Sequence, residues 1–385
     1  MIEIGRLEFF LSGISRKSRT VTFSSLNLKE TEFHLRKHQE DELSNLSYFL
    51  QYFEAKGADT TSVKTIRNPW KIKCKSLNIE NTGFSYVNDL KKMESYTGID
   101  FDNVHLTRIQ LNIRDMMIEG ETSSGNVKQI SFLERSGFDL KSFSGDLLFS
   151  PVKLSVDQMK AEVNNSSLDL DLLFEYENML AFNDFISQVK MHGIFRPTKL
   201  DMSNIGYFAP VMFTMTDIIN LSGEISGTVD HLKGENLDVS YGRNTVFKGN
   251  IEMSGLPDIM TTYAEADIVR LSTDAADVRS FALPGDAGII AVPELLQIAG
   301  VVNISGAYTG FYNSFVSRLN INSRLGNIST DLTVRTAGVS NEIAYTGKIN
   351  AKQLDIGKFS GMQETFGNAS FFLTVDGRGL TQKAI

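Results

Sequence analysis

The segment Gly300–Asn350, GVVNISGAYTGFYNSFVSRLNINSRLGNISTDLTVRTAGVSNEIAYTGKIN, decides the fold of this chain. Apolar and polar residues alternate along four parts of it, at positions 302–309, 315–322, 328–334 and 343–349. Successive side chains of a β-strand point to opposite faces of a sheet. The alternation therefore predicts four strands, each with one apolar face and one polar face.

The links between these four strands are only a few residues long and rich in Gly, Asn and Ser: Thr309–Asn313, Arg324–Gly326 and Thr336–Asn341. Parallel neighbours in an open sheet need a crossover of about a dozen residues or more. Links this short therefore favour antiparallel pairing, and the segment predicts a meander that is apolar on one side.

The same phase of alternation extends through the C-terminal part of the chain and selects apolar residues for one side of the sheet. They are Leu221, Ile225, Phe247, Ile251, Ile304, Phe315, Leu319, Ile321, Leu332, Ile343 and Phe371. Glycines recur on this side, at Gly223, Gly227, Gly249, Gly306 and Gly347. Glycine inside a strand permits strong bending and leaves space at the inner surface. We therefore expect a strongly curled sheet whose apolar side forms an open groove.

Two repeats organise the chain. SLNLKETEFHL (Ser25–Leu35) and SLNIENTGFSY (Ser76–Tyr86) share five identities in eleven positions at a shift of 51 residues. A longer repeat of about 80 residues carries Ser-Gly pairs at 144–145, 226–227 and 305–306. A single copy is too small to bury its own apolar face, so the repeats predict one continuous, elongated sheet.

We divide the chain accordingly into an N-terminal β-repeat segment, residues 1–142, and a series of meander repeats, residues 143–385. Short helices interrupt the strands. Glu42–Gly57 places Leu and Phe on one helical stripe and predicts a helix that packs on the sheet. Two further helical insertions are expected, at Phe182–Val189 and Thr273–Phe281. The fold class is therefore all-β with a few short helices.

Composition excludes several functional classes. With 42% hydrophobic and 22% charged residues, the 385-residue chain has the composition of a folded protein. A net charge of −8 without a dense Lys/Arg patch argues against a nucleic-acid partner. No apolar run approaches the ~18 residues of a membrane span, and the first residues lack the layout of a signal peptide. Because both ends fall on strand-like sequence, we expect an internal piece of a longer protein.

Residues that could carry chemistry are scattered. His34 and His38 stand four apart without a third ligand nearby, so we expect no metal site. Asp169 and Asp171 share one face of a strand and predict a solvated polar surface. The single cysteine, Cys74, forms no intramolecular disulfide. Since nucleotide-binding and hydrolase motifs are also missing, we expect no catalytic residues and no cofactor.

Several stretches resemble the TamB branch of the AsmA-like bridge proteins, in the form found in Bacteroidetes. They are SLNIENTGFSY, GIDFDNVHLTRIQLNI (Gly98–Ile113), ISFLERSGFDLKSFSG (Ile130–Gly145), VFKGNIEMSGLPD (Val246–Asp258) and ISGAYTGFYNSF (Ile304–Phe315). The resemblance covers most of Phe23 to Leu380 and is one of pattern. It implies a long curled sheet with a hydrophobic groove, in a protein anchored in the inner membrane of a Gram-negative bacterium and crossing the periplasm.

The resemblance further implies that phospholipid acyl chains bind the groove, and that an outer-membrane β-barrel partner meets a C-terminal segment this chain lacks. Acyl chains suit an apolar groove because their binding grows by roughly 0.8 kcal/mol per buried CH₂ and needs no directional contacts. We therefore expect a periplasmic bridge segment that conducts phospholipids between the two membranes. One alternative is a module that assembles outer-membrane proteins through its sheet edges. Another is an extracellular adhesin or polysaccharide-binding β-repeat, which would place aromatics and carboxylates on its exposed face.

Overall fold

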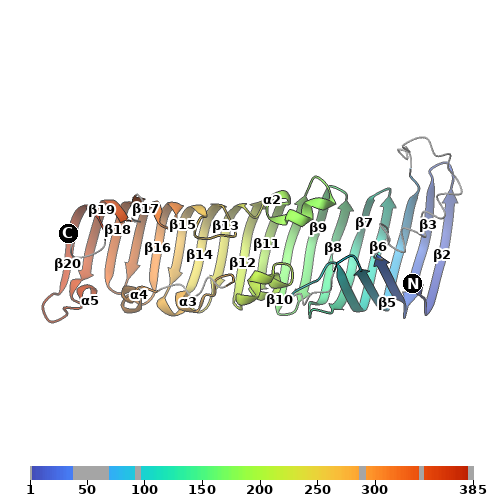
Figure 1. Ribbon diagram of the computed structural model, residues 1–385, viewed down its shortest axis with the longest axis horizontal. Helices are drawn as coiled ribbons and strands as arrows, with labels where there is room; N and C mark the ends of the chain where they lie inside the picture. Colours follow the sequence, from blue (N-terminus) through green and yellow to red (C-terminus); the bar gives the residue numbers. More distant parts are fainter. Residues whose placement is uncertain (1, 38–68, 92–96, 286–291, 338–341, 380–385) are drawn as a thin grey trace. The chain divides into compact units, whose positions relative to one another are not determined.

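The computed structural model describes residues 2–37, 69–91, 97–285, 292–337 and 342–379 (Figure 1). Its strands are β1 (Ile2–Glu3), β2 (Arg6–Ser15), β3 (Thr20–Lys29), β4 (Glu32–Lys37), β5 (Lys71–Asn88), β6 (Asn103–Glu119), β7 (Thr122–Glu134), β8 (Asp139–Ser150), β9 (Lys153–Val163), β10 (Ser166–Glu175), β11 (Lys190–Asp201), β12 (Ile218–Gly227), β13 (His231–Tyr241), β14 (Thr245–Ser254), β15 (Tyr263–Thr273), β16 (Val302–Phe311), β17 (Ser314–Ser323), β18 (Gly326–Ala337), β19 (Glu342–Asp355) and β20 (Asn368–Arg378). Its helices are η1 (Met179–Asp184), α2 (Phe185–Gln188), η2 (Met202–Tyr207), η3 (Pro210–Thr214), α3 (Ala275–Ser280), α4 (Glu294–Ala299) and α5 (Ile356–Ser360).

The all-β class with a few short helices is confirmed, because these strands belong to one long, mainly antiparallel sheet of 20 strands. The helices α2 and α3 fall inside the insertions expected at 182–189 and 273–281. The helix expected at 42–57 lies outside the described residues. The chain divides into two compact units, Met1–Leu173 with Asp201–Phe213 and Phe174–Leu200 with Thr214–Ile385.

The four strands predicted from Gly300–Asn350 are β16, β17, β18 and β19, and each pairs antiparallel with the next. Antiparallel pairing continues from β12 to β16 on one side and into β20 on the other. Two residues separate β16 from β17 and two separate β17 from β18, as the short links required. The meander is therefore confirmed.

The 51-residue repeat near the N-terminus is realised as parallel pairing. β3 and β4 both lie along β5, and every paired residue is matched with the residue 51 positions later, such as Leu26 with Leu77 and Phe33 with Phe84. Like residues therefore lie side by side, and the Asn78 side-chain amide donates to Asn27 Oδ1 at 2.7 Å. The first copy breaks into two strands, whereas the second is the single long strand β5.

β-Bulges interrupt the strands at recurring positions. Gln158, Asn236 and Gln353 each have a positive φ near 51° inside a strand. In each case a polar side chain of the following strand accepts the hydrogen bond from the backbone N–H of the bulged residue. The three acceptors are Asp171 Oδ1 at 2.6 Å, Asn250 Oδ1 at 2.8 Å and Ser370 Oγ at 2.9 Å. A bulge inserts one extra residue into its strand. Apolar side chains before and after the bulge therefore lie on the same face although they are an odd number of positions apart.

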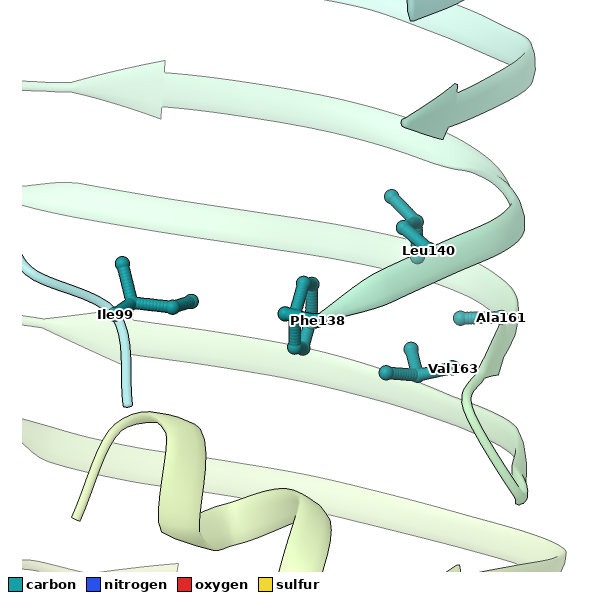
Figure 2. Packing of buried hydrophobic residues seen from close by; sticks show 5 residues of the cluster. All are labelled: Ile99, Phe138, Leu140, Ala161 and Val163. Carbon is teal, nitrogen blue, oxygen red and sulfur yellow. The ribbon is translucent and has the colours of Figure 1, made fainter. Parts of the chain in front are cut away.

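The first unit has a compact core where the ends of several strands meet the segment 201–213. Figure 2 shows Phe138 between Ile99 on one side and Leu140, Ala161 and Val163 on the other. The Tyr207 ring packs edge-on against Phe138 with ring centroids 5.4 Å apart. Its hydroxyl donates to the Gly137 carbonyl at 3.1 Å, so the segment 201–213 is tied to the β7–β8 turn.

Candidate functional site

The second unit carries the residues selected from the sequence, and strand register places all eleven of them on one face of its sheet. Cross-strand partners in a sheet point to the same side. Ile304 lies opposite Ile321, which lies opposite Ile328. Equivalent chains of partners run from Leu221 in β12 to Phe371 in β20. We call this side of β12–β20 the apolar face.

Other residues of this face escaped the sequence pattern because bulges break the alternation. Leu237 and Val239 in β13 lie opposite Gly249 and Phe247 of β14. In β15, Ile268 and Leu271 are three positions apart and yet both face this side, since the register shifts between them. A pair of apolar residues at a spacing of three inside a strand was the signal that could have revealed them.

Glycines on the apolar face have backbone conformations that other residues rarely adopt. All five glycines singled out in the sequence have positive φ, from 102° at Gly227 to 156° at Gly249. At Gly306 and Gly347 the φ angles are 132° and 151°. A Cβ at either position would lie 2.0 Å from a backbone oxygen of the neighbouring strand. Both positions therefore require glycine, and each leaves a gap between larger apolar neighbours.

The two faces of the sheet differ in chemistry and exposure. All eleven selected side chains are half-buried. In β17 burial alternates: Phe315, Leu319 and Ile321 are half-buried and Ser317 is buried, whereas Val316, Arg318, Asn320 and Asn322 are exposed. The Arg318 side chain, on the opposite face, is 76% exposed. Large apolar side chains thus share one side and remain partly accessible.

One margin of the apolar face is covered by the helices α3, α4 and α5, which Figure 1 shows along the same rim of the strands. There Ala299 of α4 packs with Val302, Leu325, Ala351 and Leu354 in a buried cluster. Ala351 and Leu354 are 1% and 3% exposed. Ile304, Ile321 and Phe371 pack against this cluster from the open part of the face. The same face is therefore a sealed core at this margin and partly accessible elsewhere.

A buried carboxylate holds α3 in place. Asp277 accepts hydrogen bonds from the backbone N–H groups of Arg243, Asn244 and Thr245, and from the Thr245 hydroxyl at 2.9 Å. Burial alone would raise the pKa of Asp277. The donated hydrogen bonds outweigh that effect, so its pKa lies below the usual range. The carboxylate therefore clamps α3 to the β13–β14 turn at pH 7.

At the opposite margin, aromatic side chains border the apolar face. Tyr308 and Phe315 stack with ring centroids 5.2 Å apart. The Tyr308 hydroxyl donates to the Phe311 carbonyl at 2.8 Å, and burial raises the pKa of this phenol. Tyrosine suits this position because its ring lies against apolar neighbours while its hydroxyl has a polar partner.

The residues weighed for chemistry lie apart from this face or have structural partners. His34 Nδ1 lies 2.8 Å from Ser85 Oγ, and His38 lies outside the described residues. Asp169 pairs with Lys160 Nζ at 2.7 Å, and Asp171 supports the bulge at Gln158. Among the residues that the structure describes, no three His, Cys, Asp or Glu side chains are grouped so as to hold a metal ion. No helix in the described part of the chain is long and apolar enough to span a membrane.

Comparisons with protein families, with curated proteins and with solved structures gave no match for this chain.

Proposed function

We propose that the apolar face of β12–β20 lines a groove that binds and conducts phospholipid acyl chains, as part of a bridge between two membranes. The observation that carries the proposal is the shared register of eleven large apolar side chains that remain half-buried. A partly accessible apolar surface favours an apolar occupant, since contiguous apolar patches are costly to leave in water. Acyl chains fit it because they need apolar contact and no directional hydrogen bonds.

Curling of the sheet about this face is part of the proposal. The positive-φ glycines and the bulges at Asn236 and Gln353 support it, because both features bend strands and increase local twist. Bending toward the apolar side would bring its side chains around an acyl chain and keep the polar side in water. The helices at the covered margin would then form one lip of the groove.

The cellular setting is proposed from the sequence resemblance. In that setting the chain is a periplasmic segment of an inner-membrane-anchored bridge protein in a Gram-negative bacterium. Passive conduction would need no catalytic group or cofactor, because an acyl chain that moves along an apolar surface keeps nearly the same contact energy.

Neighbouring residues on opposite faces provide the test. A photo-crosslinking amino acid at Leu319 should label phospholipid in cells, and the same amino acid at Asn320 should label little. Leu319→Lys should abolish co-purification of phospholipid measured by mass spectrometry, because a charge there must be desolvated beside acyl chains. Asn320→Lys is the matched control. Equal labelling at both positions, or labelling only at Asn320, would show that the proposal is wrong.

A second candidate function, assembly of outer-membrane proteins through a sheet edge, is favoured by β2. This strand pairs with β3 on one side, and its residues Phe9, Phe10 and Ile14 are each about 60% exposed. Long apolar edge strands are templates for another strand. Proline in place of Phe10 should impair assembly of outer-membrane proteins and leave lipid labelling at Leu319 intact. Loss of both readouts together would count against a separate edge function.

A further inference from the structure

Among the residues that the structure describes, one rim of the second unit includes four chain connections that follow one another along the sheet. They are residues 176–189, 228–230, 255–262 and 312–313. Asp230 N–H donates to the Ile186 carbonyl at 3.3 Å, and Gly255 N–H donates to the Asp230 carbonyl at 2.8 Å. The Tyr263 and Phe311 rings, 5.2 Å apart, join the third connection to the fourth. We call this the acidic rim; α2 lies on it, opposite the rim that holds α3, α4 and α5 (Figure 1).

Large apolar side chains project from the acidic rim into solvent. Leu180, Met260 and Tyr312 are 73%, 61% and 67% exposed, and Met179 and Ile259 are about half exposed. Of the four connections of the acidic rim, all but the short turn 228–230 contribute at least one of these exposed apolar side chains. Exposed apolar residues are unremarkable singly, but several of them along one rim are typical of an interaction surface. Methionine and leucine suit such a surface because they adapt to different partners.

The charge of this rim is one-sided. Its four connections contain Glu177, Asp184, Asp230 and Asp258, and no Lys or Arg. The opposite rim of the same unit comprises the described residues 214–217, 242–244, 274–285, 292–301, 324–325 and 356–367. There, five acidic residues (Asp217, Asp274, Asp277, Glu294, Glu364) stand beside four basic ones (Arg243, Arg279, Arg324, Lys358). The excess of acidic residues over basic ones is therefore a property of the acidic rim and does not follow from the net charge of the unit.

We propose that the acidic rim docks a cationic amphipathic helix of a partner protein. The apolar side of such a helix would lie on Leu180, Met260 and Tyr312, and its Lys or Arg side chains would meet the carboxylates. The connections from β11 to β17 span six strand spacings, roughly 29 Å, which matches a helix of about 19 residues. Carboxylates disfavour the surface of an anionic membrane, which is why we assign the rim to a protein partner.

A designed peptide provides the test. An 18-residue helix with Leu on one face and Lys on the other should bind the full chain, and its Lys→Glu counterpart should not. Fluorescence anisotropy of the labelled peptides would measure both affinities. Leu180→Ser with Met260→Ser should weaken binding of the cationic peptide by about tenfold or more, since a few central apolar anchors dominate such interfaces. Glu177→Gln with Asp258→Asn should weaken it and reduce its dependence on salt.

Matched variants on the opposite rim distinguish docking from general attraction to an acidic protein. Phe359→Ser with Met362→Ser removes two side chains that are 44% and 51% exposed there, and should leave the affinity unchanged. Circular dichroism checks that each variant is folded. Equal binding of the two peptides, or equal loss from both pairs of apolar substitutions, would overturn the proposal. Lipid labelling at Leu319 should not respond to any of these variants, so this test and that of lipid conduction are separate.

Discussion

The covered margin of the apolar face and its open part have the same kinds of side chain but different surroundings. Under α4 and α5, Ala351 and Leu354 are almost completely buried. Two strands away in the same sheet, Phe315 and Leu319 remain half-buried. Both sets lie on one face by strand register. The sequence pattern that selects this face therefore cannot distinguish a core position from a position open to a ligand.

The comparison indicates where stability and function separate. A side chain sealed under a helix contributes its full burial to folding, whereas a half-buried one contributes less and remains available to a ligand. Substitutions along the same face should therefore change from structural to functional in their effect as one moves away from α4 and α5. The free energy of local opening, measured by hydrogen exchange on β16–β20, is the suitable quantity, because a repeat-built sheet need not unfold in one step.

The largest expected effect is at Leu354. Leu354→Ala should lower the free energy of opening of β19 and β20 by about 2–5 kcal/mol, because it leaves a cavity in a sealed cluster. Leu319→Ala in the open part should cost about 1 kcal/mol. The half-buried side chain contributes only part of the free energy of full burial, and its removal leaves no closed cavity. Equal losses at the two positions would mean that the open part is as tightly packed as the covered margin.

A second prediction concerns the glycines. Gly306→Ala should destabilise β16 and β17 by about 2–4 kcal/mol, because the new Cβ would meet the Arg318 carbonyl at a φ that alanine avoids. Gly367→Ala is the control, since a Cβ there has no neighbour within 4 Å. Hydrogen exchange on both variants checks the difference. A neutral Gly306→Ala would remove the argument that glycine is required at this position.

A third prediction concerns pH. Because the pKa of Asp277 is lowered in the folded chain, its stabilising effect is present above the unfolded pKa, near 3.9, and is lost as pH falls through the lower folded value. Protection of α3 and the β13–β14 turn should therefore decline below about pH 4. Asp277→Asn should cost about 1–3 kcal/mol at pH 7 and flatten this decline. An unchanged acid profile in Asp277→Asn would assign the decline to other carboxylates.

Period-two alternation predicted the apolar face of β16–β18 and of β19 as far as Ala351, because these parts pair without a bulge and keep the residues of that face at one parity. It failed at β13 and β15, where one extra residue moves the apolar set to the other parity. A bulge is set by pairing between strands, so a single strand's sequence contains little record of it. The sequence likewise placed Ile304 and Leu319 on one face but could not show which of them lies nearer to the margin that the helices cover.

Tertiary contacts explain the other differences. α4 is only six residues long, and its helix is maintained by packing on Val302 and Leu325, not by local propensity. The 51-residue repeat was visible in sequence, but its parallel pairing was not, since β4 and β5 are joined by a connection long enough for either direction. The polar clamp at Asp277 likewise joins residues more than 30 positions apart. Alternation identifies faces, and long-range contacts decide what covers them.

The smallest expected effect is on the polar face, one residue from Leu319. Arg318 Nε lies 3.5 Å from Asp331 Oδ1 on the neighbouring strand, and the two side chains are 76% and 59% exposed. Water and salt screen such a pair, and holding two long side chains in place costs entropy, so exposed pairs contribute about 0–1 kcal/mol. Arg318→Ala should therefore change the free energy of opening of β17 by less than about 0.5 kcal/mol and leave lipid labelling at Leu319 unchanged. Asp331→Asn should match it in both respects, because it breaks the same pair from the other side. If either variant weakened lipid labelling while β17 stayed intact, the polar face would also contact lipid, and the division of roles between the two faces would be wrong.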